Sequence, residues 1–150
     1  MVKTPQYVFR GTTVKFEGSM HSQSLPMTSV STHPVIALWF AKECMQAYPE
    51  KACIYIAETN ELLAFKKNEN VLAPLEREIA YGLKPADFYK HSLGYISVQV
   101  MQEALRKEGI DSSAIARLEN LSFLCSETKD IRAKKIAKIV TEIKQYLKND

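Results

Sequence analysis

The sequence predicts an α+β fold in which the strands come first and most of the helices follow. Hydrophobic residues make up 46% of the chain and charged residues 25%, proportions typical of a globular protein. Before about residue 95 the apolar runs are short and rich in β-branched and aromatic residues, which is typical of strands. After it, apolar residues recur near the helical period of 3.6. This order favours α+β over a parallel α/β fold.

The chain length predicts a single domain, 1–150, because domains most often contain about 100–150 residues. Residues 1–95 are expected to form mainly strands with one helix between them. Residues 96–150 are expected to form a helical extension.

Five short runs predict strands, and one helix interrupts them. This helix is expected to begin at Pro34, since proline suits the first helical position, and to reach about Tyr48. Thr32 or His33 is its predicted N-cap. The predicted strands are Gln6–Arg10, Met27–Thr32, Ala52–Ala57, Leu62–Lys66 and Glu76–Tyr81.

The segment after residue 95 begins with two competing patterns. Val98, Met101 and Leu105 form a helical stripe that ends at Gly109, a residue suited to follow a helix. Tyr95–Val100 also alternates as a strand does, so both interpretations stay open there.

Two further helices are predicted near the C-terminus. Asp111 or Ser112 can cap a short one that extends through Leu121. The clearest stripe runs from Ile136 to Leu147. The many lysines of this last segment predict a solvated helix face, with a weak patch for an acidic partner as the alternative.

Composition and charge exclude several classes of protein. The net charge of +3 is too small to predict a nucleic-acid binder, and Pro34–Ala41, the longest uncharged apolar stretch, is too short to cross a membrane. The N-terminus lacks the apolar core of a secretory signal, so synthesis in the cytoplasm is expected, with export by another route left open. The cysteines and histidines lack metal-ligand spacing, which predicts no metal site and reduced, buried thiols.

Phe9-Arg10-Gly11 is the first of three segments that could carry chemistry. An arginine at a strand end presents a planar, permanently charged group suited to phosphate or carboxylate, and the glycine lets the backbone turn away. A surface arginine before a turn is the alternative interpretation.

The second segment surrounds Ser31 at the end of a predicted strand. Ser29 and Ser31 share one face of that strand, where hydroxyls can orient a carboxylate or a ligand. Capping of the following helix by Thr32 is the alternative. No nucleophile motif surrounds Ser31.

The third segment is Glu76-Arg77-Glu78-Ile79. Carboxylates two residues apart on one strand face lie roughly 6 to 7 Å apart, so each raises the cost of ionising the other. One of them can therefore be tuned for acid-base work or for stabilising a cation. A solvent-exposed strand face is the alternative.

In this order, the three segments resemble the Arg-Ser-Glu signature of the mono-ADP-ribosyltransferases, the group related to cholera-like and clostridial binary toxins. The matching elements are Phe9-Arg10-Gly11, Ser31-Thr32-His33 and Glu76-Arg77-Glu78-Ile79, and they span about residues 7 to 85. His33 replaces the final serine of the Ser-Thr-Ser element. The resemblance implies a split β-sheet core with one helix after the Ser-Thr strand.

The resemblance also implies roles for these residues. Arg10, with Gly11, would hold the phosphates and ribose of NAD, and Thr32 would support the nicotinamide side. Ser31 would orient Glu78, the expected catalytic residue, which would bond the ribose 2′-hydroxyl and stabilise the positive charge that develops as nicotinamide leaves.

Further roles concern the acceptor and the edges of the cleft. Glu76 would orient the incoming nucleophile, and its being Glu rather than Gln favours an arginine acceptor. Tyr55 and Phe65 are candidates for stacking on nicotinamide, and Thr12 and Thr13 for bounding the cleft.

The expected function is transfer of ADP-ribose from NAD to a protein side chain by a bacterial effector or toxin-like enzyme. Its partners would be NAD and an acceptor protein, and a protein activator or inhibitor is a further candidate. An NAD glycohydrolase, with water as acceptor, is one alternative. A non-catalytic binding module that uses the basic C-terminal helices is the other.

Overall fold

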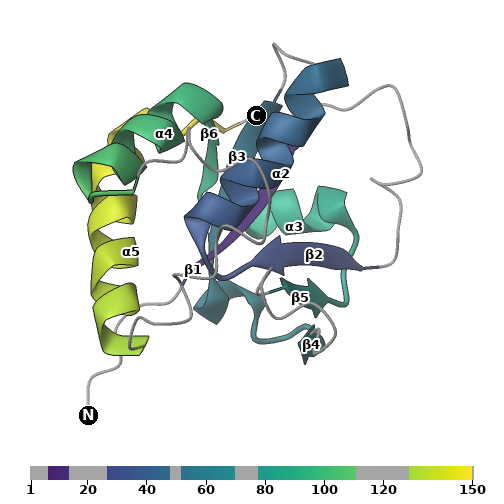
Figure 1. The fold of residues 1–150 in the computed structure, drawn as a ribbon. Coiled ribbons are helices and arrows are strands. Elements are labelled where there is room, and N and C mark those ends of the chain that lie inside the picture. The colour runs from purple at the N-terminus through teal and green to yellow at the C-terminus, as the bar shows by residue number, and fades with distance from the viewer. Residues whose placement is uncertain (1–6, 14–26, 48–51, 70–77, 111–128, 150) are drawn as a thin grey trace.

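A six-stranded sheet forms the centre of the structure (Figure 1). The computed structural model describes residues 7–13, 27–47, 52–69, 78–110 and 129–149. The strands are β1 (Tyr7–Thr13), β2 (Thr28–Ser31), β3 (Ala52–Glu58), β4 (Lys67–Glu69), β5 (Glu78–Tyr81) and β6 (Gly94–Ser97). They lie in the order β4-β5-β2-β1-β3-β6, and each neighbouring pair is antiparallel. The predicted α+β class is confirmed.

The two sides of β1 differ in how they pair. β1 pairs with β3 at every residue from Tyr7 to Thr13, but its pairing with β2 consists of Phe9 and Ser31 alone. The sheet therefore has two halves. We call β1-β3-β6 the β1 half and β4-β5-β2 the β2 half, and they meet at this one residue pair.

The helices cover the sheet unequally. They are α2 (Pro34–Ala47), α3 (Pro85–His91), α4 (Val98–Lys107) and α5 (Lys129–Ile143). Residues of α2, α4 and α5 pack with Phe9, Ile54 and Ile96 in one hydrophobic cluster. Phe88 of α3 packs in a second cluster with Val8, on the opposite face of β1. Among the described helices, three thus cover one face of the sheet, and α3 covers the other.

The predicted helix after β2 is confirmed. Pro34 is its first residue, and Ala47 is its last, one residue before the expected end at Tyr48. Of the two candidate caps, His33 supplies the bond: its ring Nδ1 accepts from the Val35 N–H at 3.1 Å. This contact satisfies one of the N–H groups that a helix start leaves unpaired.

The strand predicted at Leu62–Lys66 is wrong. Thr59–Leu62 is a 3-10 helix, the Phe65 N–H donates to the Leu62 carbonyl oxygen at 3.1 Å, and β4 begins only at Lys67. Leu62 is buried, whereas Leu63 is 79% exposed. The inward residues Leu62 and Phe65 are three apart, which fits a 3-10 turn rather than the period of two of a strand.

The sequence analysis missed α3, so the expectation of one helix before residue 95 is also wrong. Pro85 begins this helix and its seven residues are too few for a periodic pattern. Both patterns seen after residue 95 are present: β6 ends at Ser97, and the Ser97 hydroxyl oxygen then accepts from the Val100 N–H at 3.2 Å to cap α4. Gly109 has φ +81°, as its predicted place after the helix requires.

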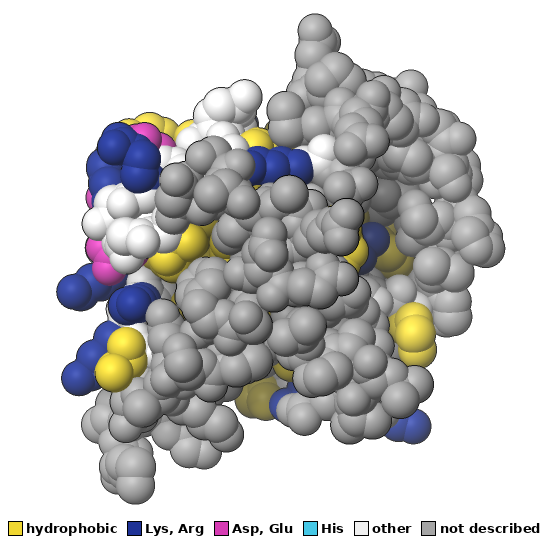
Figure 2. Space-filling view, in the orientation of Figure 1, with side chains coloured by type: hydrophobic (Ala, Val, Ile, Leu, Met, Phe, Trp, Pro, Cys, Tyr) yellow, Lys and Arg dark blue, Asp and Glu magenta, His cyan; other side chains and the backbone are white. Residues whose placement is uncertain are grey.

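The C-terminal helix is confirmed as α5, followed by a 3-10 turn at Lys144–Tyr146. Lys134 and Lys138 are exposed, as a solvated face requires, and Figure 2 shows basic side chains over α4 and α5. The helix expected to end at Leu121 lies outside the described residues. Within the described ranges, no helix is long and apolar enough to span a membrane.

Candidate functional site

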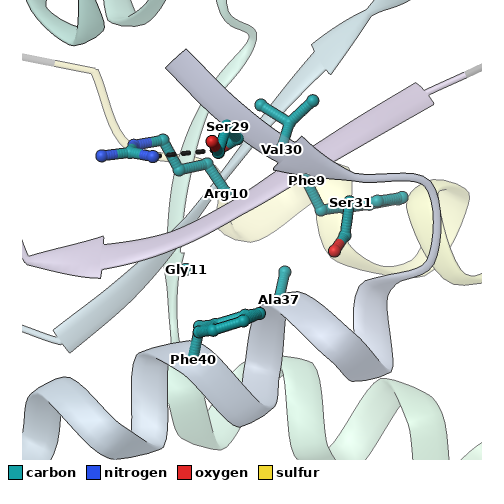
Figure 3. A pocket seen from close by; sticks show the side chains of 8 residues that line it. All are labelled: Phe9, Arg10, Gly11, Ser29, Val30, Ser31, Ala37 and Phe40. Atoms are coloured by element: carbon teal, nitrogen blue, oxygen red, sulfur yellow. Dashed lines mark hydrogen bonds between the residues drawn. The ribbon is translucent and has the colours of Figure 1, made fainter. Parts of the chain in front are cut away.

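A hollow of about 140 Å³ lies where β1 and β2 separate, above α2 (Figure 3). Its walls come from both halves of the sheet and from the helix beneath them. The residues that line it are Phe9, Arg10, Gly11, Ser29, Val30, Ser31, Ala37 and Phe40. Two of the three segments singled out in the sequence, those of Arg10 and Ser31, therefore meet at one place.

The hollow exists because the β1–β2 ladder stops after the Phe9–Ser31 pair. The carbonyl oxygen of Ser29 accepts from Arg10 Nη1 at 2.9 Å. A side chain from β1 thus bonds a backbone group of β2 where the ladder itself has ended. This contact links the two strands while leaving space between them.

Gly11 brings α2 close to this opening. A Cβ atom built on Gly11 would overlap the carbonyl oxygen of Ala37 and would lie 2.7 Å from the backbone nitrogen of Ala41. Only glycine admits the helix at this distance. The sequence analysis assigned Gly11 to cofactor binding, and the structure gives it a packing role at the floor of the hollow.

Arg10 is held on two sides. Its Nη1 donates to Ser29 as described, and its Nε donates to the Tyr89 hydroxyl at 3.2 Å. Because successive side chains of a strand point to opposite faces, the side chain of Arg10 leaves β1 on the face opposite to that of Phe9. It still lines the hollow because the neighbouring strand has separated there. Figure 3 shows the guanidinium next to Ser29, on the side of the strands away from Ala37 and Phe40.

Ser31 joins the first and third segments of the signature. It lies opposite Phe9 of β1 on one side and opposite Glu78 of β5 on the other. Ser31 is 5% exposed and lines the hollow. Directly opposite residues of an antiparallel pair have Cβ atoms about 5 Å apart, so the register makes Ser31 and Glu78 neighbours.

The structure describes only part of the acidic segment. Glu78 is the first residue of β5, and its backbone position is given by its register with Ser31. Its side chain and the whole of Glu76 lie outside the described part of the chain.

Thr32 and His33 follow Ser31 and lead into α2. Thr32 is half-buried, and it is not among the residues that line the hollow. His33 is 1% exposed and caps the helix through Nδ1. Thr32 was expected to support the nicotinamide side of the site, but it does not line this hollow.

The aromatic residues fall into two groups. Tyr55 is 4% exposed and stacks on Tyr89 with ring centroids 4.0 Å apart, and Phe65 packs edge-on against His91. Neither lines the hollow, so neither is placed to stack on a ligand inside it. Phe40 does line it.

Phe40 lies in the helix predicted from Pro34 to about Tyr48, and the sequence analysis assigned it no role in a site. The sequence feature that could have indicated a role in the site is the spacing of Phe40 from Ala37. Ala37 and Phe40 are three residues apart, so they share the helix face that also meets Gly11. Phe40 is half-buried, whereas Ala37 is 1% exposed.

This arrangement is suited to an anionic ligand that carries a flat ring. Arg10 offers a fixed guanidinium, Ser31 a hydroxyl, and Phe40 an aromatic wall. Among the residues that the structure describes, no three His, Cys, Asp or Glu side chains are grouped so that they could hold a metal ion.

Comparisons with protein-family models, with curated proteins and with solved structures find no match to this chain. The three sequence segments and their arrangement in the sheet are therefore the features that bear on function.

Proposed function

We propose that this protein is an NAD-dependent mono-ADP-ribosyltransferase that transfers ADP-ribose from NAD to a protein side chain, arginine, and releases nicotinamide. One observation supports this above all. Phe9, Ser31 and Glu78 are far apart in the sequence, yet they occupy one register across three neighbouring strands, with Arg10 next to Phe9. This register places the three short segments of the signature side by side in the sheet.

The size of the hollow limits what it can hold. Pockets for complete drug-sized ligands measure about 300–1,000 Å³. A hollow of about 140 Å³ suits a single ring. We therefore assign it to the nicotinamide, with Phe40 as its aromatic wall. We assign the diphosphate of NAD to the guanidinium of Arg10, which lies next to Ser29 on the other side of the strands from Phe40.

In the proposed reaction, the bond between nicotinamide and C1′ of the ribose breaks, and its electron pair leaves with nicotinamide. Positive charge then develops on the ribose. The carboxylate of Glu78 stabilises that charge and bonds the 2′-hydroxyl, while Ser31 orients the carboxylate. An arginine nitrogen of the acceptor protein bonds to C1′ and transfers its proton to Glu76.

The test is NAD cleavage by the Glu78→Gln variant. Glutamine keeps the size of the side chain and removes its charge, so we expect loss of at least about 100-fold in the rate, with unchanged thermal unfolding. The matched control is Glu61→Gln, at an exposed glutamate of the 3-10 helix, which should cleave NAD at the wild-type rate. Each protein is incubated with NAD labelled on the adenylate, with and without a cell lysate.

The products distinguish the possible results. Glu78-dependent label on a protein band would support the transferase, and Glu78-dependent free ADP-ribose in every sample would favour an NAD glycohydrolase. Full cleavage by folded Glu78→Gln would contradict the role of Glu78. No cleavage by folded wild-type protein in either condition would favour a non-catalytic binding module.

A further inference from the structure

We propose that Tyr89 of α3 is a positioning residue for Arg10, which it holds in the orientation that binds the diphosphate of NAD. This inference rests on the proposed function. Its basis is the bond from Arg10 Nε to the Tyr89 hydroxyl at 3.2 Å, which connects residues far apart in the sequence. Neither the sequence pattern nor the family resemblance assigns a role to Tyr89.

Tyr89 is itself fixed by packing. Its ring stacks on Tyr55 at 4.0 Å between centroids, with the planes 18° apart. Tyr55 is 4% exposed and lies directly opposite Arg10 on β3. Arg10 and Tyr55, whose ring supports that of Tyr89, are thus neighbours in the same sheet.

The backbone of α3 is held at the same point. The Tyr89 carbonyl oxygen accepts from the Ser92 hydroxyl at 2.7 Å and from the Ser92 N–H at 3.2 Å, which ends the helix. Phe88, the preceding residue, is fully buried in the cluster beneath. The hydroxyl of Tyr89 therefore projects from a well-anchored helix.

Two fixed contacts orient a guanidinium better than one. A guanidinium has five N–H groups, and the two bonds to Tyr89 and Ser29 use one on Nε and one on Nη1. The remaining three are available for phosphate oxygens as far as the described residues are concerned. Because Nε and Nη1 are both engaged, the plane of the group is set, and planar donors bind phosphate best when pre-oriented.

The experiment uses Tyr89→Phe, which keeps the stacked ring and removes only the hydroxyl. We expect the KM for NAD to rise about tenfold, the effect of one hydrogen bond to a charged group, with kcat changed less than about twofold. In an Arg10→Lys background, the same substitution should change KM by less than about twofold, because the Nε donor is already gone. Tyr95→Phe is the matched control, since this ring also borders Tyr55 and it should keep the wild-type KM.

A second measurement needs no enzymatic activity. The Nε–H signal of Arg10, assigned in the NMR spectrum by its loss in Arg10→Lys, should exchange with water several-fold faster in Tyr89→Phe than in the wild type. Tyr95→Phe should leave this exchange rate unchanged.

Each outcome decides the proposal. An unchanged exchange rate in Tyr89→Phe, or a KM that does not respond, would overturn it. A rise in KM that is equally large in the Arg10→Lys background would also overturn it, because Tyr89 would then act by another route. If the wild type cleaves no NAD, the proposed function fails, and the exchange rate alone decides whether Tyr89 holds Arg10.

Discussion

The two sides of β1 differ in how much of the strand is paired with its neighbour. Toward β3, its backbone is paired along all seven residues; toward β2, it is paired at Phe9 and Ser31 only. The continuous ladder leaves no space for a ligand. The interrupted ladder leaves a hollow, and Arg10 bonds a backbone carbonyl of β2 beside it.

The two halves of the sheet also differ in how they are covered. In the β1 half, Ile54 packs beneath α2, α4 and α5. In the β2 half, Ile79 packs in the cluster of the opposite face, with α3. The β1 half is thus packed against helices on both faces, because Val8 and Tyr55 join the cluster of α3, and the candidate site lies at the border of this half. This contrast can be tested.

The largest expected difference is in stability. Ile54→Ala should lower the free energy of unfolding by about 4 kcal/mol, because Ile54 is fully buried and the helices around it cannot all move into the space. Ile79→Ala makes the same change in the β2 half, where the side chain is 8% exposed, and should cost about 2 kcal/mol. Urea unfolding followed by circular dichroism measures both values.

Ile54→Val serves as the control for side-chain size and should cost about 1 kcal/mol. Equal losses in Ile54→Ala and Ile79→Ala would show that the two halves contribute equally to stability. The contrast between them would then concern backbone pairing alone.

A smaller effect is expected where the interrupted ladder meets α2. Gly11→Ala places a methyl group against the Ala37 carbonyl oxygen, so the helix must shift, and we expect a loss of about 2 kcal/mol in stability. Because Gly11 also lines the hollow, NAD cleavage should fall as well. Thermal unfolding and initial rates measure the two effects.

Gly82→Ala is the matched control for Gly11→Ala. The nearest atom to its added Cβ would be Lys66 Cβ at 3.6 Å, an ordinary contact, so stability should stay within about 0.5 kcal/mol of the wild type. If Gly11→Ala were equally harmless, the close approach of α2 would not be what shapes the hollow.

Sequence reasoning succeeded where a pattern was long or chemically distinctive. The α+β class, the helix that begins at Pro34 and the helix through Ile136 followed from such patterns. The approach of Arg10 to Ser31 was expected only through the family resemblance, because nothing local in either segment encodes contact between them.

The failures occurred where short segments depend on tertiary contacts. α3 has too few residues to show a period, so neither the helix nor the role of Tyr89 could be predicted. The apolar residues Leu62 and Phe65 were assigned to a strand, although they form a 3-10 turn whose inward residues are three apart. The bond from Arg10 to the Ser29 carbonyl oxygen, formed where the β1–β2 ladder has ended, likewise has no local signal in the sequence.

The smallest expected effect concerns the face of the β2 half that lies away from the hollow. Tyr81 is 3% exposed, and burial raises the pKa of its hydroxyl above the ordinary value of 10.0. Below pH 10.0 the hydroxyl is neutral in both the folded and the unfolded chain, so it does not make stability depend on pH. As the pH rises above 10.0, the unfolded chain loses this proton first, and stability falls until the pH reaches the folded pKa.

Tyr81→Phe should remove that alkaline loss, a difference below about 1 kcal/mol near pH 10.5, measured by urea unfolding from about pH 8 to 10.5. Tyr146→Phe, at a tyrosine that is 49% exposed, is the control. If Tyr81→Phe lost stability at high pH as steeply as the wild type, then water would reach Tyr81 in the folded protein. The burial of this face of the β2 half against α3 would then be contradicted.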